Sequence, residues 1–163
     1  MLIQQHVDGS DFFNRSWAEY KVGFNDSSGN YWLGNDMLSQ LTLNGRYKLR
    51  FDLQLHSNHS RYWAEYSSFV VLGEAYNYRM QVSGYSGNLG DALSYHNDMM
   101  FTTYDRDNDP WTHSNPVHTN NCAVGYGNGF WHKTCVRCHI NGARGHFHWY
   151  SNRLQTSRMW LTC

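Results

Sequence analysis

Apolar and polar residues alternate most regularly in the first half of the chain. Every second side chain from Tyr47 to Leu53 is apolar, which is typical of a half-buried β-strand. The segments 63–72 and 76–82 continue the alternation and predict two further strands. A sheet is therefore the expected framework of this half.

Two short segments have helical spacing instead. Between Ser10 and Tyr20 the aromatic residues recur at roughly helical intervals, and Asp11 is a candidate for the residue that caps the first turn. The pair Asn35-Asp36 precedes apolar residues at positions 37, 38 and 41, which predicts the start of another helix.

The regular pattern fades after Ser83. Glycines at 84, 87 and 90, the Asp/Asn cluster at 105–109 and the glycine-rich stretch 125–129 all indicate loops. With no internal repeat or linker, we expect a single domain over 1–163. Its sheet-forming part would span about 1–82 and its loop-rich part about 83–163. The cysteines and acids of the loop-rich part are the candidates for holding it in shape.

Composition sets the size of the molecule and argues against some partners. A protein of 163 residues and 19.1 kDa suits one domain. Its 13 basic and 13 acidic residues give a formal net charge of zero, so neither nucleic acid nor an anionic membrane is favoured. No apolar run approaches the roughly 20 residues of a membrane helix. The abundant aromatic rings suit a core, a ligand pocket or both.

Three carboxylates occur at alternate positions in the segment 105–109, at Asp105, Asp107 and Asp109. Alternate side chains of an extended backbone point the same way, and calcium, with roughly six to eight oxygen ligands, best relieves the resulting repulsion. An EF-hand loop does not fit, because Pro110 and Pro116 occupy the positions where that loop needs Gly and Glu. The alternative is an exposed acidic turn with no ion.

The four cysteines, at 122, 135, 138 and 163, allow several arrangements. A Cys122–Cys135 bridge would remove chain entropy worth roughly 3 kcal/mol from the unfolded state. Alternatively, Cys135 and Cys138 have the spacing of zinc ligands, with His132 and His139 nearby and Cys122 upstream. A redox Cys-x-x-Cys pair normally lies where a strand feeds a helix, and no such pattern is present. From these residues alone, both bridge and metal remain open.

An ordered series of motifs runs along nearly the whole sequence. It comprises Val7-Asp8-Gly9-Ser10 followed by Phe13, Arg15, Trp17 and Tyr20; Tyr31-Trp32-Leu33-Gly34-Asn35-Asp36; Ala64-Glu65-Tyr66-Ser67-Ser68-Phe69; Gly84-Tyr85-Ser86-Gly87; Gly90-Asp91-Ala92-Leu93; Tyr95-His96-Asn97; the segment 100–109; and Asn121-Cys122-Ala123 with Cys135 and Asn141-Gly142. The series resembles the fibrinogen-like domain family, which includes fibrinogen chains, ficolins, tachylectins and angiopoietins.

The resemblance implies an α+β fold with a twisted antiparallel sheet, short helices and a loop-rich calcium and recognition subdomain. It also implies the disulfide between Cys122 and Cys135, and a calcium ion held by Asp107 and Asp109 with Asp105 in support.

Two backbone carbonyls normally complete the family's calcium site. Counting forward from Asp109 gives Trp111 and His113, whereas counting back from the first bridged cysteine gives His118 and Asn120. The link between these points is longer than in the family, through an insertion that contains Pro116.

The family's recognition pocket lies beside the calcium, around the disulfide loop. In members that bind acetyl groups, a cis peptide before the second cysteine orients backbone donors, and the equivalent bond here joins Thr134 and Cys135. Tyr126 falls at a position that lines the acetyl pocket, and Phe130 and Trp131 match the family's aromatic pair. The expected function is lectin-like binding of acetylated glycans in innate-immune pattern recognition.

Two departures from the family favour an alternative. Val136 stands where the family usually has His, and the segment from Ala143 to His148 is shorter than the family's equivalent, which carries a pocket Tyr. A protein-binding domain without sugar binding, or a partial and non-functional gene product, would explain them. Cys138 and Cys163 have no family partner, and could bridge each other, cross-link protomers or stay free. No motif supplies a nucleophile with an ordered base, so an enzyme is not expected.

The family domain opens with further strands and another disulfide before Leu2, so we expect the protein to be truncated at its N-terminus. For that reason the lack of a signal peptide at Met1–His6 does not exclude secretion. Sequons at Asn14, Asn25 and Asn58 are consistent with an extracellular protein. Family members display several such heads on a stalk, so an oligomeric full-length parent is expected.

Overall fold

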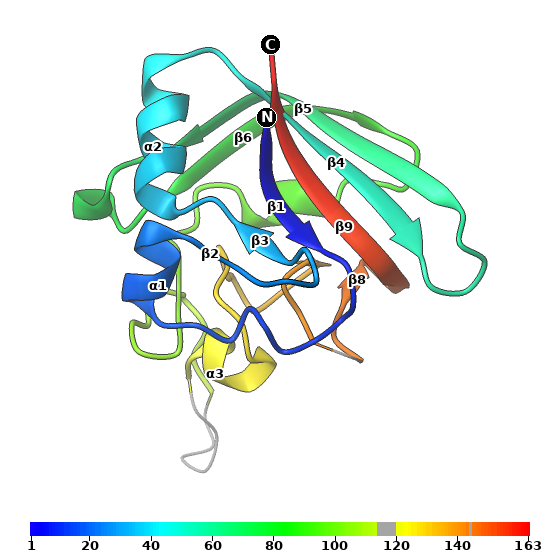
Figure 1. Cartoon of the computed structure of the whole chain (residues 1–163). Helices are drawn as coiled ribbons and strands as arrows, with labels where there is room; N and C mark the ends of the chain where they lie inside the picture. The colour runs from blue at the N-terminus through cyan, green and yellow to red at the C-terminus, as the bar shows by residue number, and fades with distance from the viewer. Residues whose placement is uncertain (114–119, 144) are drawn as a thin grey trace.

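The computed structural model describes residues 1–113, 120–143 and 145–163 (Figure 1). Its elements, in order along the sequence, are β1 (Leu2–His6), α1 (Trp17–Val22), β2 (Phe24–Asn25), β3 (Tyr31–Trp32), α2 (Asn35–Asn44), β4 (Lys48–Leu55), β5 (Arg61–Val71), the 3₁₀ turn η1 (Glu74–Tyr76), β6 (Met80–Gly87), the 3₁₀ turn η2 (Leu93–His96), α3 (Cys122–Tyr126), β7 (Cys138–His139), β8 (His148–Trp149) and β9 (Asn152–Thr162).

The strands form one antiparallel sheet in the order β2-β3-β1-β9-β4-β5-β6, and the β7–β8 ribbon joins it through β9. Figure 1 shows the sheet as a twisted layer, with α1 and α2 along one side and the loops around α3 below. The two termini meet, since the Met1 amine donates to the Leu161 carbonyl. The expected α+β fold is confirmed.

The predicted strands and the second helix are present with shifted limits. Strands β4 and β5 cover the alternating segments, whereas β6 begins at Met80 because Glu74–Tyr76 forms a 3₁₀ turn. The first helix begins at Trp17 rather than near Asp11, because Ser16 caps it. The Ser16 side chain accepts from the Glu19 amide, and the Glu19 carboxylate accepts from the Ser16 amide.

The division into a sheet-forming part and a loop-rich part needs a correction. Strand β9, near the end of the sequence, lies between β1 and β4 in the middle of the sheet. Its buried residues are Leu154, Ser157, Met159 and Leu161. The spacing from Leu154 to Ser157 breaks strict alternation, and the buried residue there is polar, so the pattern gave no strand signal.

Much of the core consists of aromatic rings in tilted and edge-to-face contact. The Trp131 ring lies 5.2 Å from Phe101 and 6.1 Å from Trp32, and Tyr20 lies 5.0 Å from Phe101, between ring centroids. All four side chains are at most 1% exposed. The aromatic content therefore serves mainly the core. No described helix is both long and apolar enough to cross a lipid bilayer.

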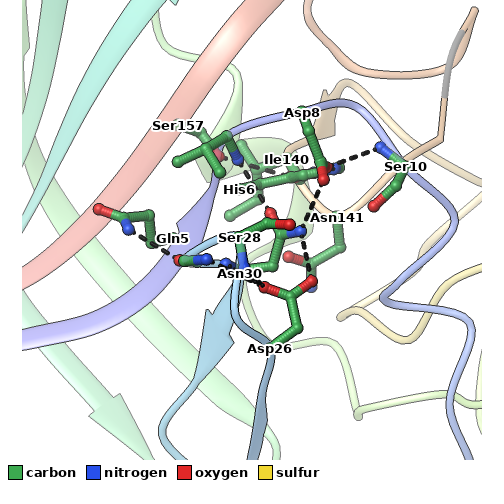
Figure 2. Close-up of polar contacts among 12 residues, drawn as sticks. Gln5, His6, Asp8, Ser10, Asp26, Ser28, Asn30, Ile140, Asn141 and Ser157 are labelled. Atoms are coloured by element: carbon green, nitrogen blue, oxygen red, sulfur yellow. Dashed lines mark hydrogen bonds and ion pairs between the residues drawn. The ribbon is translucent and has the colours of Figure 1, made fainter.

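A buried polar network ties β1 to the loop that follows β7 (Figure 2). Gln4 donates to the Asn141 side chain and to Ser157 of β9, and the His6 ring contacts the Ile140 carbonyl at 3.0 Å. The Asn141 amide in turn donates to the Gly129 carbonyl. Because these groups are buried, their pairing fixes the β7 end against the sheet.

The Tyr20 hydroxyl joins α1 to the segment that precedes Phe130. It donates to the Phe13 carbonyl at 2.6 Å and accepts from the Gly129 amide at 3.1 Å, with the ring fully buried. We expect Tyr20→Phe to lower the free energy of unfolding by about 1–3 kcal/mol, because it leaves the buried Gly129 amide unpaired, whereas the Phe13 carbonyl keeps its bond from the Arg15 amide. Urea denaturation measures this. Tyr76→Phe, at a 64% exposed side chain, should change little, and equal effects of the two variants would contradict the role of Tyr20.

Candidate functional site

The three acids of the 105–109 segment do not share one role. Asp105 accepts from the Trp17 amide at 2.9 Å and from the Thr103 hydroxyl at 2.7 Å. It thus holds the first residue of α1 against the acidic segment, beside the Ser16 cap. Its carboxylate is a structural acceptor and turns toward the helix.

Asp107 and Asp109 lie side by side. The Asp109 amide donates to Asp107 at 3.3 Å, and the half-buried Asp109 carboxylate accepts from the amides of Trp111 and Cys122 at 3.0 and 2.9 Å. Burial raises the pKa of Asp109 to about 6, with a contribution from the Asp107 charge and against the lowering effect of the two amides. Within the described part of the protein, neither carboxylate forms an ion pair with a basic side chain. Two adjacent hard-oxygen ligands without a counterion are suited to a divalent cation.

Asn108, between these acids, fixes the segment from within. Its amide group donates to the Phe101 carbonyl at 2.9 Å, and its backbone amide donates to the Thr102 hydroxyl at 3.0 Å. Further along, the His113 amide donates to the Asn120 side chain at 2.7 Å. The other carbonyl candidate, His118, and the inserted Pro116 lie outside the described residues.

Asn121 joins the acidic segment to α3. Its side-chain oxygen accepts from the amides of Ala123 and Val124, which caps the helix. Its side-chain nitrogen donates to the Thr103 carbonyl at 3.0 Å. Cys122, the first cysteine of the bridge, therefore lies at a helix start that is hydrogen-bonded both to Asp109 and to the Thr103 carbonyl.

The disulfide between Cys122 and Cys135 is confirmed, with a Cα–Cα distance of 5.5 Å. The rival zinc site at these positions is not formed, because the Cys135 sulfur is bonded to Cys122. Cys138 is buried and Cys163 is exposed, and both are free thiols in the described part of the protein. The peptide bond between Thr134 and Cys135 is cis, as the resemblance implies.

The loop around Cys135 presents an exposed, basic rim. The Thr134 hydroxyl lies against the Tyr95 hydroxyl, and both residues reach solvent. Two cations cover the Tyr95 ring, with the Lys133 amine 4.8 Å and the Arg137 guanidinium 4.5 Å from its centroid. These side chains give the rim hydrogen-bonding groups and positive charge.

His96 supports this rim from beneath. One ring nitrogen lies 2.9 Å from the Trp131 carbonyl, and the other accepts from the amides of Arg137 and Cys138 at 3.0 and 3.2 Å. Since the second nitrogen must be the acceptor, the ring is neutral and carries its hydrogen on Nδ1. Burial lowers the pKa of His96 to about 3.

The predicted ligand-binding aromatics divide into two kinds. Tyr126 ends α3 with its ring partly exposed, 5.2 Å from the His139 ring and 5.5 Å from the His146 ring. Phe130 and Trp131 have no exposed surface. The expectation that these two line a pocket is corrected, because both side chains pack in the core. A cavity of about 470 Å³ lies elsewhere, on β4, β5 and β9.

Sequence reasoning assigned no role to several residues that shape this region. Tyr95 and His96 were part of a motif, but their contacts join segments far apart in the sequence. Lys133 and Arg137 gave no signal, since single surface cations are common. His139 was named only as a neighbour of the alternative zinc site at the cysteines. Its position within ten residues of His146 and His148 is the clue that the sequence offers to this cluster.

Comparisons with known proteins agree with this geometry. The family described as fibrinogen beta and gamma chains, C-terminal globular domain, matches residues 1–162. Human ficolin-3 is 41% identical over 143 residues, which cover 87% of this chain and 45% of ficolin-3. The chain spans less than half of the length of the first curated relatives it matches.

Solved structures match over almost the whole length. The fibrinogen-like globe domain of human ANGPTL2 has a TM-score of 0.86 at 34% identity, covering 99% of this chain and 78% of that one. A lamprey fibrin D-dimer, in complex with the peptide Gly-His-Arg-Pro-amide, has a TM-score of 0.83 at 28% identity, over 98% of this chain and 60% of that one.

The buried neutral histidines predict a loss of stability in acid. Burial also lowers the pKa of His132 to about 4. The unfolded protein takes up protons below about pH 6.5 while folded His96 and His132 stay neutral, so stability present above that pH is lost as pH falls. The loss is about 1.4 kcal/mol per histidine for each pH unit, down to the folded pKa values. Melting temperatures should fall from pH 7 to pH 5 in buffers of constant composition. His96→Gln should flatten this slope relative to the exposed-site control His59→Asn, and an unchanged slope would contradict it.

Proposed function

This protein belongs to the family described as fibrinogen beta and gamma chains, C-terminal globular domain, and we propose that it is an extracellular recognition domain that binds acetylated glycans beside a structural calcium ion. Its likeness to fibrinogen-like domains supports a recognition or binding module, and none of the comparisons points to catalysis. The zero formal net charge gives no support to nucleic acid as a partner.

One hydrogen bond carries the proposal. The Asp109 carboxylate accepts from the amide of Cys122, whose sulfur is bonded to Cys135. The exposed Asp107, the half-buried Asp109 and the exposed loop at Thr134 are thereby linked through the disulfide. A cation at the acids would hold the recognition loop in place without touching the ligand.

Calcium suits the donors that the acid pair offers. Asp107 and Asp109 would hold it, and the ion would neutralise two adjacent charges that the described basic side chains leave uncompensated. Asp105 is engaged by the Trp17 amide, so its part is to anchor the segment. Chelation should therefore loosen the loop as well as lower stability.

The exposed groups around the bridge suit an acetylated sugar. The partly exposed Tyr126 ring offers apolar surface for a methyl group, and the Tyr95 and Thr134 hydroxyls offer donors and acceptors. The 41% identity with ficolin-3 supports a sugar ligand, because ficolins are among the lectin-like members of the family. Secretion is supported by the disulfide and by three exposed sequon asparagines, Asn14, Asn25 and Asn58.

A protein or peptide ligand is the second candidate. The lamprey fibrin structure holds a short peptide that contains a cation, so a similar fold can bind a peptide. The basic rim of Lys133 and Arg137 would here favour an acidic segment of a partner. Retention of a partner in excess acetyl sugar would favour this candidate.

Calcium should raise the melting temperature of the whole protein. An ion that binds only the folded form stabilises it by about 2.7 kcal/mol at one hundred times its dissociation constant. We expect Asp109→Asn and Asp107→Asn to abolish most of the shift, and Asp98→Asn, an exposed acid at positive φ, to retain it. Calorimetric melting with calcium and with chelator measures this. A wild-type melting temperature that is insensitive to calcium would refute the cation site.

N-acetylglucosamine should bind to the protein in the presence of calcium, and removal of calcium with a chelator should weaken this binding. Tyr126→Ala should reduce affinity about ten-fold, equivalent to about 1.4 kcal/mol, because it removes the apolar contact. Tyr76→Ala, at an exposed ring, is the matched control. Isothermal calorimetry gives both constants. Absence of heat from a wild-type sample that shows the calcium-dependent melting shift would remove the glycan and leave the peptide candidate.

A further inference from the structure

Three histidines gather on the β7–β8 ribbon. His139 of β7 and His148 of β8 are direct partners in the antiparallel register, so their side chains emerge next to each other on one face. His146 lies in the turn that joins the two strands. One ring nitrogen from each of the three lies within 4.8 Å of the other two. No other group of three or more potential metal ligands is found among the described residues.

The buried members of this cluster carry nitrogens with no partner. His139 is fully buried, and Nδ1 of both His139 and His148 has no hydrogen-bond partner in the described part of the protein. An unpaired buried polar atom costs about 1–3 kcal/mol, so its retention needs a reason. A bound ion supplies one, because a metal bond replaces the missing hydrogen bond.

We propose that His139, His146 and His148 bind a divalent transition ion of the zinc class, with a fourth position open to water or another ligand. Imidazole nitrogen is a preferred ligand of zinc, and three protein ligands with one open position are a common arrangement. This inference goes beyond the proposed function, since the calcium site uses carboxylates on a different segment.

The ligand geometry needs only side-chain motion. Nitrogens on a tetrahedral zinc ion lie about 3.3 Å apart when each bond is about 2.0–2.1 Å. His146 is exposed and His148 is half-buried, so their rings can turn toward His139 and an ion can enter from solvent.

Asn128 is placed to orient the buried ligand. Its side-chain amide lies against Nε2 of His139, which leaves Nδ1 for the ion. Binding at Nδ1 requires the hydrogen on Nε2. A half-turn of the amide would bring the Asn128 oxygen, which has no partner in the described part, to accept that hydrogen, at the loss of the bond that the amide nitrogen donates to the Tyr126 carbonyl at 3.0 Å.

The site has a direct connection to the recognition surface. The Tyr126 ring packs against both His139 and His146, so an ion that fixes these rings also fixes the tyrosine. The close approach of Gly142 to His146 restricts the turn further, since a Cβ at Gly142 would meet the His146 carbonyl oxygen at 2.0 Å. A bound ion would therefore hold the β7–β8 ribbon and the Tyr126 ring in one arrangement.

The test uses the whole protein, stripped with chelator and then returned to excess calcium so that the acid pair is filled. Titration with zinc is followed by calorimetry, and with cobalt by its visible absorption, which intensifies in a tetrahedral site. We expect one zinc ion per molecule. His146→Ala and His148→Gln should each weaken zinc binding by about ten-fold or more, and His59→Asn should bind as the wild type does.

His146 is exposed, so its variant should keep the fold, and a cooperative melting transition like that of the wild type verifies this for every variant. Zinc affinity that is the same in wild type, His146→Ala and His148→Gln overturns the proposal. A folded wild type that binds no zinc also overturns it. Neither result bears on glycan binding, which is measured with the acetyl sugar in calcium alone.

Discussion

Buried backbone groups without a sheet partner are the constraint on which this structure depends. The segments around α3 cross the interior as loops, where each unpaired N–H or C=O would cost free energy. Polar side chains supply the missing partners: Asn121 bonds the Thr103 carbonyl, Asn141 bonds the Gly129 carbonyl, and His96 bonds the amides of Arg137 and Cys138. These buried Asn and His residues do for the loops what ladder hydrogen bonds do for the sheet.

The same side chains also place the functional surface. Asn121 caps α3 while it reaches the acidic segment, so the start of that helix, the first bridged cysteine and Asp109 are held together. The bridge closes a short loop, which limits the unfolded state and favours one arrangement of the exposed rim. His96 then supports that rim from the core side. These hydrogen bonds limit the movement of the loops that carry the exposed rim.

The two proposed metal sites differ in ligand chemistry and lie on different segments, so they would not compete for one ion. Carboxylate oxygens at Asp107 and Asp109 favour calcium, whereas the three imidazoles of the β7–β8 ribbon favour zinc-class ions. Each would stiffen a different part of the surface, the first the bridged loop and the second the short hairpin beside Tyr126. The basic rim at Lys133 and Arg137 adds positive charge to the exposed surface beside them.

Local pattern and motif order in the sequence determined the β4 and β5 strands, the helix from Asn35, the family, the bridge of Cys122 with Cys135 and the acid segment, because each is encoded by neighbouring residues or by ordered spacing. Only the tertiary structure placed β9 between β1 and β4, since that pairing joins opposite ends of the sequence. Likewise, only the tertiary structure shows that Asp105 bonds to α1, that Phe130 and Trp131 are buried in the core, and that His139 pairs with His148. Such contacts are chosen by long-range packing, where the free energy of burying a ring or pairing a distant strand outweighs what any local pattern can indicate.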